Sequence, residues 1–394
     1  MPWIKFYTFG CKANQYDTQV LREKYLSLGF KEVENGSADL YVVNTCVVTQ
    51  KAEGESRALV ERLKKKNSSA QILLVGCLQR LQGQEKGSGR FSPNLEEEIS
   101  FFAGHRRAFL KIQDGCNNFC SYCIVPYVRG ESRSKPKELV LREFTRLFKN
   151  GYKEIVLTGI CLGEYGKDLS PPSSLVDLLK VLEELNGDFR VRLSSLDPQY
   201  INEEFLNFLS QAKKLCPHLH IPFQSGDDFV LKKMNRRYTK EFACAIIKEI
   251  RKKIPQFVFT TDIMVGFPEE KEENFQNTLA FLEYLKPLKV HIFKFSPRPG
   301  TPAEKIKNQV KPQEVQQRFL ALRLLEKSWR EEILNNFLGK RISFLREKEI
   351  SPGLFSGHSE HYLNVLLQTQ EKIPDEFIEI EVKGMRGDWV YGTL

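Results

Sequence analysis

A chain of 394 residues is longer than one ordinary domain, so we expect two or three folded units with an ample core. Its 41% hydrophobic and 28% charged residues, with no apolar run of about 18 residues and no N-terminal signal pattern, argue against a membrane span and indicate a cytoplasmic protein. The net charge of +9 collects in residues 106–338, which hold 38 Lys/Arg against 29 Asp/Glu, and this excess fits either a polyanionic partner or solvated helix faces.

Strand-then-helix units fill the first part of the chain. The apolar runs "IKFYTF", "DLYVVN" and "QILLV" are typical of strands, and a helix is predicted after the first of them, from about Asn14 to Leu28. A second helix is predicted through "AEGESRALVERLKKK". Strands that alternate with helices indicate a parallel sheet, so residues 1–98 are predicted to form an α/β N-terminal domain. Its last part, Leu81 to Glu98, has the composition of a flexible link.

Three cysteines of this domain each stand shortly after a predicted strand. They are Cys11, Cys46 and Cys77. Because the ends of parallel strands lie at one edge of a sheet, the three side chains can converge on one point. Any one of them alone would be read as a buried free cysteine, but their shared placement favours metal ligands.

The same alternation continues through residues 99–338. Six strands are predicted there, at "AFLKI", "EIVLT", "FRVRLS", "HLHIP", "VFTTDIMV" and "KVHIFKF". Six such units predict a partial (βα)6 barrel, open or nearly closed, followed by a long helix from about Gln313 to Leu338. After Gly339 the sequence changes to short runs in which apolar and polar residues alternate. These runs are "RISFL", "YLNVLLQ", "FIEIEVKG" and "WVYGTL", and they predict a small all-β domain over residues 339–394.

The stretch "GCNNFCSYCIVP" places three cysteines, Cys116, Cys120 and Cys123, within eight residues and offers no fourth. Structural zinc sites and ferredoxin clusters use four ligands. Three thiolates on a [4Fe-4S] cluster would leave one iron open, and an open position lets a metal site bind a ligand. A zinc knuckle that only braces the fold is the alternative.

A CxxxCxxC motif after the first of six βα units resembles the radical S-adenosylmethionine enzymes. The resemblance implies that the open iron binds S-adenosylmethionine, which is cleaved reductively to a 5'-deoxyadenosyl radical. The order of the three domains resembles the methylthiotransferases. That family implies a second [4Fe-4S] cluster on Cys11, Cys46 and Cys77, a C-terminal TRAM-like RNA-binding domain, a tRNA partner, an electron donor such as a flavodoxin or ferredoxin, and a monomer.

Two motifs resemble one branch of that family. "GCKANQYD" around Cys11 and "LTGICLGEYG" at 157–166 are similar to the branch that methylthiolates threonylcarbamoyladenosine beside the tRNA anticodon. The branches that act on isopentenyladenosine or on a ribosomal protein remain alternatives. A metal-bound RNA-binding protein without catalysis is the rival from another class.

The resemblance also implies a cofactor site at the strand ends. Tyr122 would contact the adenine, Gly159 the methionine part, Ser194 and Ser195 the carboxylate or ribose, and Gly266 the adenine through its backbone, while Gln224 and Arg236 would face the cavity. For each polar residue among them, a helix cap or a solvent contact is the simpler interpretation.

Three features depart from the family pattern. The interval between Cys77 and Cys116 is short, so the end of the N-terminal domain, within residues 78–105, is expected to be reduced. Cys161 stands where this branch often has His and is interpreted as a bystander near the site. The C-terminal domain is slightly acidic, with 7 Lys/Arg against 9 Asp/Glu.

Cys216 and Cys244 have apolar surroundings in sequence and are predicted to be core residues.

Overall fold

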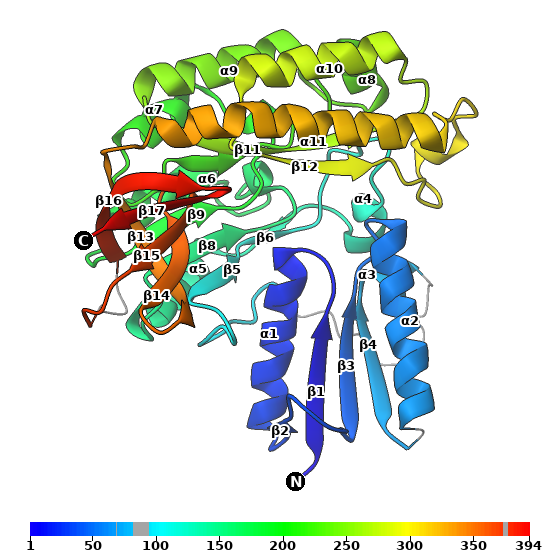
Figure 1. Cartoon of the computed structure of the whole chain (residues 1–394). Helices are drawn as coiled ribbons and strands as arrows, with labels where there is room; N and C mark the ends of the chain where they lie inside the picture. Colours follow the sequence, from blue (N-terminus) through cyan, green and yellow to red (C-terminus); the bar gives the residue numbers. More distant parts are fainter. Residues whose placement is uncertain (68, 82–93, 373–376) are drawn as a thin grey trace.

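The computed structural model describes residues 1–67, 69–81, 94–372 and 377–394, and its elements gather into three groups of strands (Figure 1). The blue N-terminal sheet lies beside the green and yellow middle region, and the red and orange C-terminal strands lie against the middle region at another side (Figure 1). No helix in the described part of the chain combines the length and the hydropathy needed to cross a membrane.

The N-terminal group is a parallel sheet with the strand order β2-β1-β3-β4. Its elements are β1 (Trp3–Thr8), α1 (Lys12–Ser27), β2 (Lys31–Glu32), β3 (Leu40–Thr45), α2 (Gln50–Lys66), β4 (Gln71–Gly76) and α3 (Cys77–Leu81). Strand β3 is buried along its whole length because its alternating side chains face helices on both sides. Val42 packs in one cluster with Leu21 of α1, and Val43 packs in another with Leu59 of α2.

The three strands predicted for this domain are confirmed, and the first helix begins two residues earlier than expected. The short strand β2 was not predicted. The predicted link from Leu81 to Glu98 falls largely on residues 82–93, which lie outside the described residues.

The middle group confirms the predicted α/β partial barrel. Strands β5 (Arg107–Lys111), β8 (Glu154–Thr158) and β9 (Arg190–Leu193) form one parallel sheet, and β10 (His218–His220), β11 (Val258–Val265) and β12 (Lys289–Lys294) form another. Isolated parallel bridges, among them Ser195 to His220, continue the order from β9 to β10. Among the described residues β12 does not pair with β5, so the six strands curve into an open barrel.

Helices cover the outside of this barrel. The elements between and after its strands are β6 (Gln113–Asp114), α4 (Val125–Arg129), β7 (Arg133–Ser134), α5 (Lys137–Lys149), α6 (Leu175–Glu184), α7 (Glu203–Gln211), α8 (Asp228–Lys233), α9 (Lys240–Lys253), α10 (Glu272–Leu285) and α11 (Pro312–Asn335), with short 3-10 turns at Leu162–Glu164, Pro198–Tyr200 and Pro302–Lys305. The long helix α11, predicted from the helical spacing of its apolar residues, crosses the length of this region (Figure 1).

The C-terminal group is a closed barrel with the order β13-β14-β15-β17-β16. Its strands are β13 (Arg341–Ser351), β14 (Leu354–Ser359), β15 (Asn364–Gln368), β16 (Phe377–Arg386) and β17 (Trp389–Thr393). The all-β prediction is confirmed, but it missed β14, whose "LFSGHS" is short and rich in small polar residues. The domain boundaries at 98 and 338 and the likeness to a TRAM domain stay predictions.

Buried arginines attach the C-terminal barrel to the middle one. Arg190 donates to the carbonyl oxygens of Ser343 and His358, at 3.0 and 2.8 Å, and also pairs with Glu154. Arg192 binds the same fully buried carboxylate and donates to two further carbonyls of the C-terminal barrel. Strong charge-assisted hydrogen bonds therefore hold the two barrels in one arrangement.

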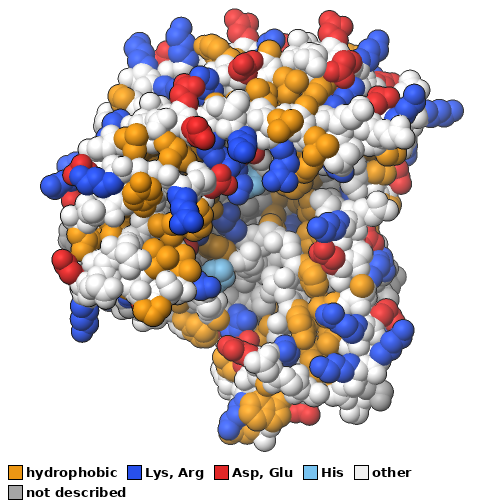
Figure 2. All heavy atoms as spheres, in the orientation of Figure 1, with side chains coloured by type: hydrophobic (Ala, Val, Ile, Leu, Met, Phe, Trp, Pro, Cys, Tyr) orange, Lys and Arg blue, Asp and Glu red, His pale blue; other side chains and the backbone are white. Residues whose placement is uncertain are grey.

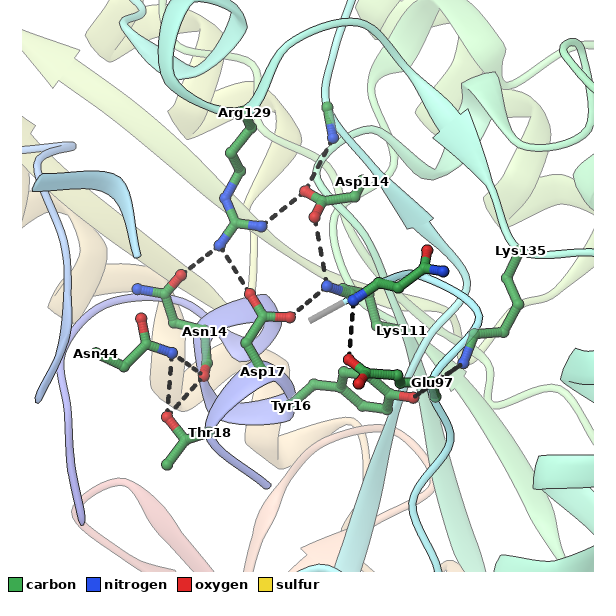
Figure 3. A network of polar contacts seen from close by, with 12 residues as sticks. Asn14, Tyr16, Asp17, Thr18, Asn44, Glu97, Lys111, Asp114, Arg129 and Lys135 are labelled. Atoms are coloured by element: carbon green, nitrogen blue, oxygen red, sulfur yellow. Dashed lines mark hydrogen bonds and ion pairs between the residues drawn. The ribbon is translucent and has the colours of Figure 1, made fainter. Parts of the chain in front are cut away.

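A second buried network joins α1 of the N-terminal domain to the middle barrel (Figure 3). Arg129 of α4 donates to Asp114 Oδ1 at 2.7 Å, contacts Asp17 Oδ2 of α1 at 3.3 Å and binds the side-chain oxygen of Asn14. Lys111 of β5 binds the other oxygens of Asp17 and Asp114. Two cations and two carboxylates thus balance one another away from water.

The network predicts a large loss of stability when one of its cations is removed. In Arg129→Met, Asp17 and Asp114 keep only Lys111 as a buried cation, and we expect the apoprotein to lose about 3–5 kcal/mol of its free energy of unfolding in urea. The control is Arg142→Met, because the Arg142 side chain is 64% exposed and its pair with Glu98 is screened by water. A loss in Arg129→Met no larger than in the control would contradict this role.

Candidate active site at the strand ends

The three N-terminal cysteines lie together at one edge of their sheet. Thr45 and Gly76 are register partners at the ends of β3 and β4, so Cys46 and Cys77, which directly follow them, are neighbours. Cys11 follows β1, the strand on the other side of β3. A Cβ built on Gly10 would lie 2.8 Å from Cys46 Sγ, and Gly10 has a φ of +95°, so only glycine fits this close approach. The convergence expected from the strand ends is therefore present.

These thiols share an electrostatic environment. Burial raises the pKa of Cys46 to about 11, and its thiol neighbours Cys77 and Cys11 act in the same direction. Burial also raises the pKa of Cys77, while Arg129, which hydrogen-bonds its sulfur, opposes that rise. Thiolates at this edge are unfavourable without a cation, which is the condition under which a bound metal stabilises a cysteine site most.

The second group of cysteines lies on the loop after β5 and β6. Its backbone is pinned at both ends: Cys116 N donates to Gly130 O at 3.1 Å, and Ser121 N donates to Met234 O at 3.0 Å. Gly115 has a φ of +76°, and a Cβ there would lie 1.9 Å from the carbonyl oxygen of Glu131, so the tight start of this loop requires glycine. Cys116 and Cys123 are half-buried and Cys120 is buried.

Polar groups surround the three sulfurs of this loop. Arg236 donates to Cys120 Sγ at 3.5 Å and is itself held by Asp197 and by Pro222 O. A hydrogen bond from Cys161 lowers the pKa of Cys116, whereas burial raises that of Cys120 and raises that of Cys123 to about 12. One thiol is thus prepared for deprotonation, and the other two require a positive partner.

The two groups of cysteines belong to one packed region. Helix α3, which begins at Cys77, packs on α4, which begins two residues after Cys123. Cys77 shares a small apolar cluster with Ile124 and Val128, and Arg80 donates to Val128 O at 3.0 Å. Arg129, at the end of α4, is close enough to Cys77 and Cys11 for both to raise its pKa. The two cysteine groups therefore lie on either side of the contact between α3 and α4.

The donor sets fit the groups that the sequence predicted. Each triad supplies three thiols, with Cys161 as a further thiol beside Cys116, and the buried hydroxyl of Ser194 has no hydrogen-bond partner among the described residues. A buried polar atom that lacks a hydrogen-bond partner in the protein is expected where a bound cofactor supplies that partner. Ser195 follows in the bridge to His220, so both serines lie at the expected edge of the barrel.

Of the next two predicted cofactor residues, Gly159 directly follows β8, and Tyr122 lies in the cysteine loop. Tyr122 packs against an apolar cluster that includes Val230 and Phe267, and burial raises its pKa strongly. Gly159 lies against Gln113, whose side-chain oxygen would be 2.8 Å from a Cβ there. No cofactor contact of these residues is tested, and their roles stay predictions.

Gln224 and Gly266 are held by the fold itself. Gln224 has a φ of +67°, and its backbone exchanges hydrogen bonds with Asp262 and Met264 of β11. The N–H of Gly266 donates to Glu270 Oε2 at 2.7 Å, so that N–H is already engaged within the protein. A backbone contact from Gly266 to the adenine therefore would have to use another atom.

Two neighbours of the first motif cysteine were not predicted as parts of the site. The ligand atoms of Cys116, Cys161 and Glu164 lie within 4.8 Å of one another, and Glu164 accepts the backbone N–H of Asn117 at 3.1 Å. Cys161 had been interpreted as a bystander, and Glu164 had no interpretation, although both stand in the motif "LTGICLGEYG". Cys216 is buried, and Cys244 is half-buried against the main core cluster, in line with the predicted core packing.

Two family descriptions match the chain. The Radical SAM superfamily matches residues 110–282, and the family described as Uncharacterized protein family UPF0004 matches residues 4–90. A solved structure of a radical S-adenosylmethionine methyltransferase from Kitasatospora setae, TsrM, superposes with a TM-score of 0.55 at 13% identity and covers 77% of each chain. That likeness concerns the fold alone.

Two curated relatives are similar over most of their length. The threonylcarbamoyladenosine tRNA methylthiotransferase MtaB of Thermotoga maritima is 36% identical and covers 92% of this chain and 91% of its own. The tRNA-2-methylthio-N(6)-dimethylallyladenosine synthase of Alkaliphilus oremlandii is 35% identical and covers 86% of this chain and 81% of its own.

Iron content tests the division into two triads. If each triad holds a [4Fe-4S] cluster, anaerobically reconstituted protein should contain about eight irons, and replacing all three cysteines of either triad by Ala should leave about four. Cys161→Ala is the matched control and should keep about eight, because Cys161 is interpreted as a neighbour of Cys116 and not as a ligand.

Two outcomes would contradict this assignment. A wild-type protein with about four irons would remove the second cluster, and a Cys161→Ala protein with about four would make Cys161 a ligand.

Proposed function

Because the chain belongs to the radical S-adenosylmethionine tRNA methylthiotransferase family, we propose that it adds a methylthio group to carbon 2 of threonylcarbamoyladenosine next to the anticodon of tRNA. The observation that carries this proposal is the joint anchoring of two cysteine triads, one from each of two domains, through α3, α4 and Arg129. An enzyme that both activates a carbon–hydrogen bond and supplies sulfur to that carbon needs two centres close to one substrate.

The family uses S-adenosylmethionine and [4Fe-4S] clusters, and the residues present fit them. Cys116, Cys120 and Cys123 would hold one cluster, and Cys11, Cys46 and Cys77 would hold the second. With S-adenosylmethionine bound, the first cluster would supply radical chemistry, and the second would carry the sulfur that is inserted.

The side chains around the first triad prepare its site. Arg236 places a guanidinium beside Cys120 and is fixed by Asp197, so a positive charge offsets the thiolate charge that burial disfavours. Asn118 donates to Cys161 Sγ at 3.5 Å and accepts from Tyr200 OH at 3.1 Å, which orients the loop between the first two cysteines. The free hydroxyl of Ser194 would bind a polar group of the cofactor.

The distribution of charge along the chain and the C-terminal barrel both support an RNA partner. The middle region carries the excess of Lys and Arg, so phosphate attraction would come mainly from it, because the C-terminal barrel is slightly acidic. The C-terminal barrel is fixed beside the middle one by Arg190 and Arg192, and as a TRAM-like module it would hold a more distant part of the tRNA.

The threonylcarbamoyl substrate is favoured over its rival by two motifs. "GCKANQYD" and "LTGICLGEYG" resemble that branch, and the Thermotoga relative that acts on this substrate is 36% identical to the chain. We further propose that the protein acts as a cytoplasmic monomer and receives electrons from a flavodoxin or a ferredoxin.

Nucleoside mass spectrometry of tRNA from cells that lack the protein tests the substrate. We expect the methylthio derivative of threonylcarbamoyladenosine to disappear, with the unmodified threonylcarbamoyladenosine in its place, and to return when the wild-type gene is supplied. A gene with Cys120→Ala should not restore it, because it removes a ligand that Arg236 contacts. Persistence of the methylthio nucleoside would refute the proposal, and loss of a methylthio group from isopentenyladenosine instead would select the rival branch.

A further inference from the structure

A polar cluster inside the middle barrel has no role in the function assigned so far. His220 ends β10, Asp262 lies on β11 and His291 lies on β12, and one ligand atom of each lies within 4.8 Å of the others. His220 is the register partner of Thr260, and Asp262 that of His291, so neighbouring strands bring these side chains to one level. All three side chains are half-buried, and Figure 2 shows a hollow between the N-terminal sheet and the rest of the molecule.

Hydrogen bonds order the imidazoles of this cluster. Thr260 Oγ1 lies 2.9 Å from His220 Nδ1 and 3.3 Å from His218 Nε2, and His220 Nε2 lies 3.2 Å from Asp262 Oδ1. His218 Nδ1 is buried without a hydrogen-bond partner among the described residues. Burying an unpaired lone pair there costs less free energy than burying an unpaired N–H. We therefore assign the proton of His218 to Nε2, which donates to Thr260, and the Thr260 hydroxyl then donates to His220 Nδ1. His220 in turn donates from Nε2 to Asp262.

The charges facing the cluster come from both domains. Burial lowers the pKa of His291 to about 4, so this imidazole is neutral near pH 7, and Asp262 supplies the negative charge. Lys12, the residue after Cys11 and the first of α1, acts electrostatically on His218 and on His291. Lys12 is half-buried, no acidic residue stands in the first turn of α1, and no carboxylate pairs with Lys12 within the described ranges. A cation without a counter-ion among the described residues thus lies within electrostatic range of His218 and of His291, the member of the cluster that contacts Asp262.

We propose that Lys12 and the His220–Asp262–His291 cluster form the recognition site for the substituent on N6 of the target adenosine. Lys12 binds the carboxylate of the threonylcarbamoyl group, and Asp262 accepts its N–H or hydroxyl hydrogen. This inference rests on the proposed function. A dimethylallyl group offers neither a carboxylate nor a donor, so it would leave these half-buried polar groups unpaired, which is a strong basis for discrimination.

A divalent metal ion is the alternative occupant, because two histidines and one carboxylate are a common zinc ligand set. The direct contact between His220 Nε2 and Asp262 Oδ1 favours a hydrogen bond, since Nε2 then carries the proton and offers no lone pair to an ion.

The test compares two anticodon stem-loop RNAs as substrates of the reconstituted full-length enzyme. One carries threonylcarbamoyladenosine, and the other carries its threoninamide analogue, in which a neutral carboxamide replaces the carboxylate. We expect wild-type enzyme to prefer the carboxylate in kcat/KM by roughly 10- to 100-fold, and Lys12→Met to bring the two values within about threefold. Damage to the neighbouring cluster would lower both rates alike, so the ratio isolates the carboxylate contact.

Two further variants complete the test. Lys64→Met, at the opposite end of α2 from the cysteine edge and 59% exposed, should keep the wild-type ratio. Asp262→Asn should lower kcat/KM for both RNAs and keep their ratio, because the donor it contacts is present in both.

Three results would overturn the inference: no wild-type preference for the carboxylate, an unchanged preference in Lys12→Met, or one equivalent of a divalent metal beyond the cluster iron that disappears in Asp262→Asn. Wild-type activity on a dimethylallyladenosine RNA, with none on either test RNA, would refute the proposed function itself.

Discussion

The buried guanidinium of Arg129 is the contact on which the arrangement of the site depends. It ends α4, the helix that follows the CxxxCxxC loop, and it binds Asp114 of β6, which directly precedes that loop, and Asp17 from α1 of the N-terminal domain. Its burial is tolerable only because two carboxylates surround it, and those carboxylates are in turn shared with Lys111. Such a network is sensitive to geometry, so it fixes the N-terminal sheet against the loop (Figure 3).

Two cysteine triads are positioned by this one contact. Arg129 hydrogen-bonds the sulfur of Cys77 and lies within electrostatic range of Cys11, while its own helix begins just after Cys123. The residues proposed to hold the sulfur-bearing centre and those proposed to hold the radical-generating centre are therefore linked through the same side chain. In the proposal above, the polar cluster of the middle barrel and Lys12 bind the substituent of the substrate base, and Lys12 directly follows Cys11 of the N-terminal triad.

Local patterns predicted the elements and the cysteines, and long-range pairing explains what they missed. Strands such as β3 and β11 are visible as apolar runs, and their order along the chain predicts that Cys11, Cys46 and Cys77 meet at one sheet edge. Asp114 and Arg129 flank the motif cysteines in sequence, but their partner Asp17 is about a hundred residues away and nothing local indicates it. The short strand β14 was missed because "LFSGHS" is weakly apolar, and the cluster around Asp262 was missed because it depends on the register of three strands.

The central claim is that two iron–sulfur centres share one space between the domains, and electron paramagnetic resonance of the reduced protein tests it most directly. Spins held in one site interact, so the spectrum of the wild-type protein should differ from the sum of the spectra of the two variants that each retain a single triad. A wild-type spectrum that this sum reproduces in full, with both clusters present and reduced, would show two independent centres and would contradict the account.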